Sequence, residues 1–400
     1  MHSIFSIALV GASLFTGSLA APTFKANSTS TGTGSYNLTP SGTSSSPPSG
    51  TSLSADGFPS PNPDQLKKIE LLAHGTLSNA PPPPPGTISA EGLINLRFIE
   101  FNENFEVAFF TSLLSNVTNG ISGFQISDEK ERSLVIEALT AVVAQEELHA
   151  LNAAGALKSQ NQDTILPCKY QFPTTNFVDA ITLAATFTDV VLGTLQDVNQ
   201  IFAQNNDTGV LRGLASIIGQ EGEQDAFYRL LQNKNLIPSA LPFLTTSTRD
   251  FAFSALQAFV VPGSCPNENL ISKDLTIFGV LTLDTKNVLP KDQNLAFEFD
   301  FKSLLNSNLK FTSGTKYDSS YDWSKASLVY INQQNLPIVE KLQNVKLSGT
   351  VVSFEAFFPF SANELNGLTL AAVTTSAGPF ASAQAVADAS IFAPALIEVN

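Results

Sequence analysis

Apolar residues recur with a period of about 3.6 between residues 89 and 260, which is the spacing of amphipathic helices. The pattern predicts five helices, divided by turns that contain Gly, Asn or Pro. Their expected ranges are about 89–114, 127–158, 176–203, 210–233 and 248–260. Two long antiparallel hairpins followed by a short closing helix are typical of a four-helix bundle.

After Cys265 the hydrophobic pattern changes to a period of two. Alternating runs, divided by Gly, Asn and Pro, are typical of short strands. The strand candidates are 275–282, 295–301, 328–331, 351–357 and 368–373. We therefore expect an α+β, multidomain chain with a helical domain at 89–266 and a small antiparallel, sandwich-like β domain at 270–400.

The N-terminal residues have a different character. Residues 4–15 are apolar but too short to span a bilayer, and small residues precede a cleavage point after Ala20. Residues 1–20 are thus predicted to be a signal peptide, and the protein to be secreted, extracellular or in the cell wall. Residues 21–88 are rich in Ser, Thr, Gly and Pro, with five prolines at 81–85, which predicts disorder and a stiff spacer around one short helix at 64–74.

Charge and rare residue types narrow the possible functions. The 35 acidic and 21 basic residues give a net charge of −14, which argues against nucleic-acid binding. Two cysteines are too few for an iron–sulfur site or a four-cysteine zinc site, and three histidines leave little room for a histidine-rich metal centre. After the signal peptide, no apolar run is expected to reach the roughly 20 residues of a membrane helix. Any chemistry must therefore depend on carboxylates and very few imidazoles.

Secretion would place the two cysteines in an oxidising compartment. Cys168 and Cys265 are then expected to form a disulfide, the alternative being two buried free thiols. Secretion also makes the N-x-S/T sequons candidate glycosylation sites. The candidate sites are Asn27, Asn116 and Asn206. A fourth sequon, at Asn37, is disfavoured by the proline that follows it, Pro40.

Residues spaced three and four apart lie on one face of a helix. On each predicted long helix, the face expected to point inward is apolar except near its middle. The polar positions are Glu103 on the first helix, Glu146 and His149 on the second, Thr188 on the third, and Glu221 and Gln224 on the fourth. A Glu-x-x-His pair places a carboxylate and an imidazole on one helix face, as in the carboxylate metal sites of helical bundles. The alternative is that Glu146 or Glu147 lies on a solvated face and that His149 is a hydrogen-bonded core residue.

Several motifs resemble a known family. They are FNENFEVAFF at 101–110, QEELHA at 145–150, QEGEQ at 220–224, YINQQN at 330–335, and the two cysteines. The chain is similar to secreted fungal ferritin-like proteins linked to late sexual development and stress response, and more distantly to plant desiccation-related proteins. The resemblance implies that the helical region is a ferritin-like bundle, with a metal site formed by the polar residues near the middle of its helices.

The polar residues near the middle of the four helices do not make up the full ligand set of a di-iron site, which needs about four carboxylates and two histidines. Thr188 stands where a carboxylate is expected, and Gln224 where a second histidine is expected. The remaining Glu103, Glu146, His149 and Glu221 would form a reduced site for one divalent metal, iron or manganese. Without a cation, three buried carboxylates would have to share protons and hydrogen bonds.

Three functional hypotheses follow. The first is a non-enzymatic secreted module of fungal development or stress response with a degenerate metal site. The second is a metal-binding protein or metal-dependent oxidoreductase. This hypothesis would be favoured if Asp189, Glu106 or Glu100 lay in the site as a replacement ligand. The third is carbohydrate or cell-wall contact through the β domain, which would require exposed aromatic residues such as those at 317, 321 and 323.

Overall fold

The computed structural model describes residues 56–232, 239–309 and 317–399. The predicted signal peptide, most of the Ser/Thr-rich region and the sequon at Asn27 lie outside the described residues. The sequons at Asn116 and Asn206 are described, but their glycosylation stays a prediction.

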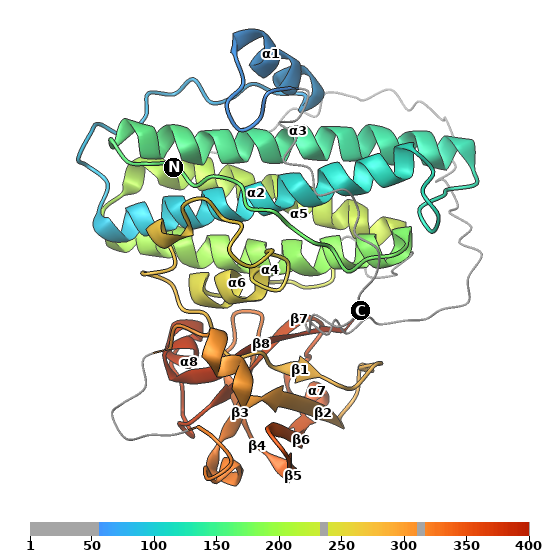
Figure 1. Cartoon of the computed structure of the whole chain (residues 1–400), viewed down its shortest axis with the longest axis vertical. Helices are drawn as coiled ribbons and strands as arrows, with labels where there is room; N and C mark the ends of the chain where they lie inside the picture. Colours follow the sequence, from blue (N-terminus) through green and yellow to red (C-terminus); the bar gives the residue numbers. More distant parts are fainter. Residues whose placement is uncertain (1–55, 233–238, 310–316, 400) are drawn as a thin grey trace, which may run out of the picture. The chain divides into compact units, whose positions relative to one another are not determined.

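The first part of the described chain is helical (Figure 1). Its helices are α1 (Pro63–Leu72), α2 (Ala90–Thr118), α3 (Glu129–Ser159), α4 (Phe177–Gln204), α5 (Leu211–Leu231) and α6 (Arg249–Leu256). Helix α2 packs against α3 and α4, and α4 packs against α5. All five helices predicted between residues 89 and 260 are present, as is the short helix predicted at 64–74.

Polar side chains fix where the long helices begin. Ser89 accepts a hydrogen bond from the backbone N–H of Gly92, and Asn176 caps α4 in the same way. Asp128 accepts from two backbone N–H groups in the first turn of α3. These caps satisfy N–H groups that have no partner within the helix. Helix α5 has no side-chain cap and instead follows a 3₁₀ turn at Thr208–Val210.

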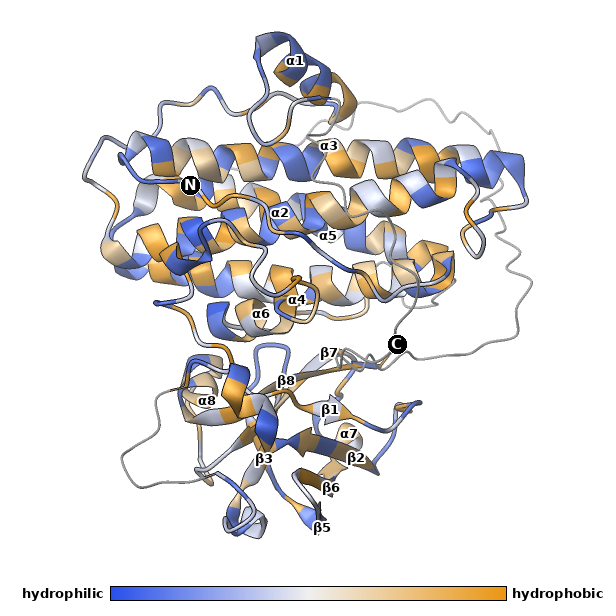
Figure 2. Ribbon diagram, viewed as in Figure 1, coloured by the Kyte–Doolittle hydropathy of each residue, from blue (hydrophilic) through white to orange (hydrophobic). Residues whose placement is uncertain are grey.

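Helices α2 and α4 are the most extensively buried helices of the bundle. Every residue of α2 from Phe98 to Val107 is buried, so this stretch has no solvated face. The hydropathy colouring in Figure 2 shows polar and apolar residues interleaved along the bundle helices.

Among the described helices, α4 alone is long and apolar enough to cross a membrane, but 78% of its most apolar window is buried inside the protein. We therefore interpret α4 as a core helix.

The C-terminal part contains two antiparallel four-stranded sheets, in the orders β1-β2-β6-β5 and β4-β3-β7-β8. The strands are β1 (Thr282–Leu283), β2 (Gln293–Asp300), β3 (Ser327–Asn332), β4 (Ile338–Lys341), β5 (Gln343–Ser348), β6 (Val351–Phe358), β7 (Gly367–Thr374) and β8 (Ser390–Val399). Two short helices, α7 (Phe360–Asn363) and α8 (Ala383–Ala389), lie between the later strands in sequence.

Aromatic side chains join the two sheets. In β2 the predicted alternation is present, with Leu295, Phe297 and Phe299 buried. Phe297 pairs in register with Phe354 of β6, while the ring of Phe299 stacks on that of Phe392 in β8 with centroids 4.0 Å apart. Because β2 and β8 belong to different sheets, these contacts confirm the sandwich-like arrangement and the α+β class.

The sheet β4-β3-β7-β8 has a second covered face. Its strands β3, β7 and β8 are buried along their whole length. Ile331, Leu370 and Leu396 join the same apolar cluster as residues of α6 and α8, and α6 contacts β8 directly. This sheet is thus packed on both sides.

Two sequence-based predictions differ from the structure. The strand expected at 275–282 is wrong except for Thr282. The backbone N–H groups of four residues in this stretch donate to side chains, and the backbone pairs with a strand only at an isolated bridge between Gly279 and Phe392; the four are Thr276, Ile277, Phe278 and Val280. The disorder expected near residues 56–62 ends earlier than predicted, since Phe58 is buried.

The disulfide expected between Cys168 and Cys265 is present and joins the connection between α3 and α4 to the chain after α6. Backbone hydrogen bonds continue this link. The N–H of Gln171 donates to the carbonyl of Phe259, and the N–H of Val261 donates to the carbonyl of Lys169. The two segments are therefore held together by covalent and hydrogen bonds.

Candidate metal centre

Three helices bring the predicted site residues together in the bundle. Glu103 lies on α2, Glu146 and His149 lie one turn apart on α3, and Glu221 lies on α5. One donor atom from each of these four residues lies within 4.8 Å of the donor atoms of the other three. The structure thus groups all four residues that the sequence pattern assigned to a metal site.

The imidazole Nδ1 of His149 is close to all three carboxyl groups. It lies 2.9 Å from Oε2 of Glu146, 3.6 Å from Oε2 of Glu103 and 3.8 Å from Oε1 of Glu221. The carboxylate side chains are at most 1% exposed, and that of His149 is 12% exposed. The four donors therefore form an enclosed cluster with one nitrogen and three carboxylate ligands.

The carboxylates of this cluster are incompletely satisfied. Both side-chain oxygens of Glu103 and both of Glu221 lack a hydrogen-bond partner among the described residues. Leaving buried acceptors unpaired costs free energy, and more so when they are charged. A cation between the helices would supply the missing interaction, so the donor set fits a bound metal.

Burial and mutual repulsion change the proton affinities of the cluster. Burial raises the pKa of Glu103 to about 7, with His149 opposing the shift and Glu146 adding to it. Burial also raises the pKa of Glu221, as do the charges of Glu103 and Glu146. For His149, burial alone would lower the pKa, but Glu146 and Glu103 more than offset it and hold the pKa well above its ordinary value. Without a cation, the cluster therefore retains protons.

A fourth carboxyl group lies beside the cluster. Glu106 is buried on α2, one turn after Glu103. Burial raises its pKa well above the ordinary value, and the charges of Glu146, Glu221 and Glu103 raise it further. Glu106 thus belongs to the same electrostatic environment, although it is not one of the four residues whose donor atoms converge.

Gln224 supports Glu146. Its amide nitrogen donates to Oε1 of Glu146 at 2.7 Å, while Tyr228 donates to its amide oxygen at 3.5 Å. Gln145 accepts hydrogen bonds from both Gln224 and Gln220. In this orientation Gln224 presents a donor to the cluster and not a lone pair. It therefore positions Glu146 through a hydrogen bond, as outer-shell residues commonly do for metal ligands.

The other candidate ligands lie elsewhere. Glu100 accepts a hydrogen bond from the backbone N–H of Ile165 at 2.6 Å. Thr188 is buried on α4, and the converging group does not include Asp189. Of the replacement ligands considered from the sequence, Glu106 is electrostatically coupled to the site, whereas Glu100 binds the backbone of Ile165.

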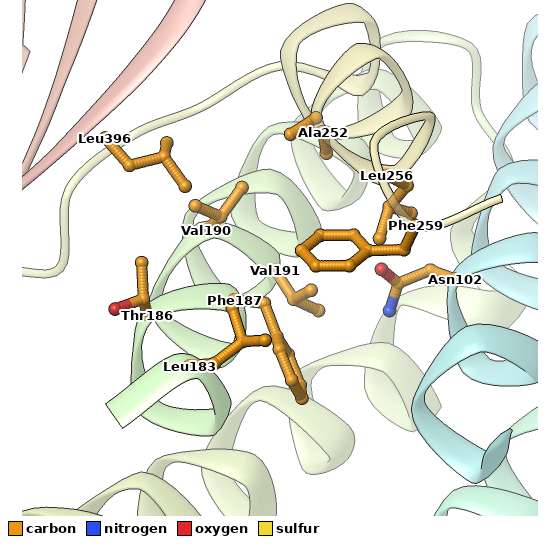
Figure 3. Close-up of a pocket in the computed structure, with 11 residues that line it drawn as sticks. Asn102, Leu183, Thr186, Phe187, Val190, Val191, Ala252, Leu256, Phe259 and Leu396 are labelled. Carbon is orange, nitrogen blue, oxygen red and sulfur yellow. The ribbon is translucent and has the colours of Figure 1, made fainter. Parts of the chain in front are cut away.

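A small apolar cavity between α4 and α6 is separate from this cluster, since none of the four converging residues lines it. Figure 3 shows the Asn102 amide among side chains such as Phe187, Val191 and Phe259. Neither polar atom of Asn102 makes a hydrogen bond of ordinary geometry, although the amide is close enough to Glu106 to lower its pKa. The lining carries no titratable side chain.

The proposed aromatic surface of the β domain is not formed by the residues considered. Trp323 is buried and packs on the ring of Phe299 with centroids 4.8 Å apart. Tyr317 and Tyr321 are partly buried against the same core. Carbohydrate contact through another surface stays a prediction.

Comparison with known families agrees with this geometry. Residues 96–234 match a family model described as a ferritin-like domain. Residues 96–234 therefore form a ferritin-like domain. The match includes every residue of the converging cluster, and it ends before α6. A search of curated proteins found no match to the chain.

Proposed function

We propose that this chain is a secreted ferritin-like protein that binds a divalent cation through Glu103, Glu146, His149 and Glu221. The observation that carries the proposal is the convergence of four donor atoms, each within 4.8 Å of the others, from His149 and three buried carboxylates. Both oxygens of two of these carboxylates, Glu103 and Glu221, lack a hydrogen-bond partner among the described residues. This favours metal binding over a bundle in which the same residues only support the fold.

Each residue has a separate role in the proposal. Glu103 and Glu221 would contribute carboxylate oxygens from α2 and α5. Glu146 and His149 would contribute an oxygen and Nδ1 from one face of α3. Carboxylate and imidazole ligands suit manganese, iron and zinc. Such a cation would supply Lewis acidity, and iron or manganese would also supply redox chemistry.

The chain's own residues would set the conditions of binding. Gln224 holds one oxygen of Glu146 through its amide, leaving the other oxygen facing His149. Because the ligand oxygens are buried, the site would exclude most water. Protons retained by Glu103 and its neighbours would have to leave as a cation enters, since metal ligands bind in their deprotonated form.

The wider biological role belongs to the same proposal. The apolar segment followed by small residues at 1–20 supports secretion, and a disulfide is typical of secreted proteins. The resemblance of the motifs at 101–110 and 145–150 to secreted fungal proteins supports a role in fungal development or stress response. Within that role, we propose metal binding as the biochemical activity.

The test compares two matched double variants of the full chain. In Glu146→Gln/His149→Asn, one carboxylate and the imidazole of the cluster are removed. In the control Glu223→Gln/His74→Asn, the same changes are made at exposed positions. Each protein is loaded with Mn²⁺, Fe²⁺ or Zn²⁺ and desalted, and bound metal is measured by elemental analysis.

We expect about one equivalent of at least one of these metals in the wild type and in the control, and below about 0.1 equivalent in the cluster variant. Circular dichroism checks that each variant is folded. The proposal is wrong if the wild type retains less than about 0.1 equivalent of every metal, or if folded wild type and cluster variant retain equal amounts.

A further inference from the structure

The segment before the bundle packs beside the helix turns that carry the candidate metal ligands. Phe58 is only 6% exposed and packs against Val107 of α2 and Ala150 of α3. These two residues directly follow Glu106 and His149 in the sequence. The carboxyl group of Asp56 also lies close enough to Glu147 to raise the pKa of that residue, in addition to the effect of burial. The beginning of the segment is therefore attached next to the ligand-bearing turns.

Helix α1 continues along the same stretch of α3. Ile69 and Ala73 are buried against Ala144, Leu148 and Leu151. At the end of α1, the side-chain amide of Gln145 donates to the carbonyl of Ala73 at 3.5 Å. Figure 1 shows α1 on the outside of the helical bundle, next to α3. The contacts of the segment on α3 thus span residues 144–151, the part of the helix that carries Glu146 and His149.

The centre is closed when this segment is in place. The three carboxylate side chains of the cluster are at most 1% exposed, and His149 is 12% exposed. A hydrated cation cannot reach buried ligand oxygens unless one of the surrounding elements moves. Many buried sites are reached by local opening of a covering segment.

Among the elements around the cluster, this segment has the fewest attachments. Ile69 is the only buried residue of α1, and Leu71 on the same helix is 65% exposed. A hollow lined in part by Pro59, Leu66 and Leu151 leaves the segment incompletely packed on α3. By contrast, α2, α3 and α5 are long helices within one bundle. Local opening is easiest where few apolar contacts are lost.

We propose that residues 56–73 form a lid that controls how fast cations enter and leave the metal centre. This inference rests on the proposed metal-binding function. Phe58 and Ile69 anchor the lid, and neither is a ligand. Loosening an anchor lowers the free-energy difference between the closed and open states, so uptake and release accelerate together. The equilibrium affinity stays nearly constant because the four ligands are unchanged.

The experiment uses two anchor variants of the full chain, Phe58→Ala and Ile69→Ala. The matched control is Leu71→Ala, which removes an exposed apolar side chain from the same helix. Each protein is loaded with Zn²⁺, and release to the chromophoric chelator 4-(2-pyridylazo)resorcinol is followed by stopped-flow absorbance. Uptake is followed in the reverse direction, and the dissociation constant is measured by calorimetry.

We expect release and uptake to be roughly tenfold faster in both anchor variants, with the dissociation constant within about twofold of the wild type. The control should exchange Zn²⁺ at the wild-type rate. If the wild type binds Zn²⁺ and both anchor variants exchange it at the wild-type rate, the lid is disproved while metal binding stands. A weaker affinity with unchanged uptake also disproves it, because the segment would then shape the site. If no metal tested for the proposed function binds to the wild type, that function fails and the lid inference falls with it.

Discussion

Glu100 shows how one buried carboxyl group can organise a neighbouring loop. Its Oε2 accepts the backbone N–H of Ile165, and the amide of Asn104 donates to the carbonyl of the same residue at 3.0 Å. Both peptide groups of Ile165 are thus held by side chains of α2. Because Ile165 precedes Cys168 in the connection between α3 and α4, these bonds fix the loop that carries the disulfide.

Glu100 also makes stability depend on pH. Burial raises its pKa from 4.5 to about 7, against opposing effects of Ile165 and Lys158. Between these values the folded state binds more protons than the unfolded state. The stabilisation from protonated Glu100 is therefore complete below pH 4.5 and is lost as the pH rises to 7. For Glu100→Gln, we expect the loss of unfolding free energy over this range to shrink by about 2–3 kcal/mol.

Urea unfolding at several pH values between 4.5 and 7.5 measures this effect. The exposed substitution Glu223→Gln is the control and should follow the wild-type pH profile. Parallel profiles for wild type and Glu100→Gln would show that Glu100 titrates alike in the folded and unfolded states.

The four converging residues could be predicted from sequence because steps of three and four residues identify one helix face. The participation of Glu106 could not be decided in this way. All residues of α2 from Phe98 to Val107 are buried, so a helical period does not distinguish the side that faces the cluster. The amide orientation of Gln224 depends on Gln145, Gln220 and Tyr228, which come from two helices and are brought together only by folding.

At the scale of elements, helices were predicted more completely than strands. Each long helix has a continuous 3.6-residue pattern, and its ends are marked by Ser89, Asp128 and other capping residues. Strand β5 was missed because most of its residues are exposed, so its sequence lacks hydrophobic alternation. Strand β8 was missed for the opposite reason. It is buried on both faces and contains Pro394, so neither alternation nor strand propensity identifies it.

Asp128 provides a test of how α3 begins. Its side chain accepts the backbone N–H groups of Lys130 and Glu131. We expect Asp128→Ala to lower the unfolding free energy by about 1 kcal/mol, because these N–H groups lose their cap. Asp128→Asn retains a capping oxygen and should stay within a few tenths of a kcal/mol of wild type. Urea unfolding measures both variants, and equal losses for Ala and Asn would contradict a capping role.

At the scale of the whole molecule, the disulfide closes a long loop. Cys168 and Cys265 are separated by 97 positions, and helices α4, α5 and α6 lie between them. A cross-link of this kind reduces the conformational freedom of the unfolded chain.

For Cys168→Ser/Cys265→Ser, we therefore expect the unfolding free energy to fall by on the order of 4 kcal/mol. Denaturant unfolding measures the loss, and wild type treated with dithiothreitol should show a similar one. A loss below about 1 kcal/mol in both samples would mean that the disulfide constrains the unfolded chain little.

The sheet β4-β3-β7-β8 is covered on one face by the other sheet and on the opposite face by apolar residues of α6 and α8. The region that matches the ferritin-like family, 96–234, ends before α6 begins. The boundary seen in sequence families is therefore not a boundary of folding. A fragment that stopped there would lack the elements that cover its apolar surface. The segment that matches the family is thus smaller than the unit that shares this apolar core, and α6, outside the match, is needed to cover both the bundle and the sheet.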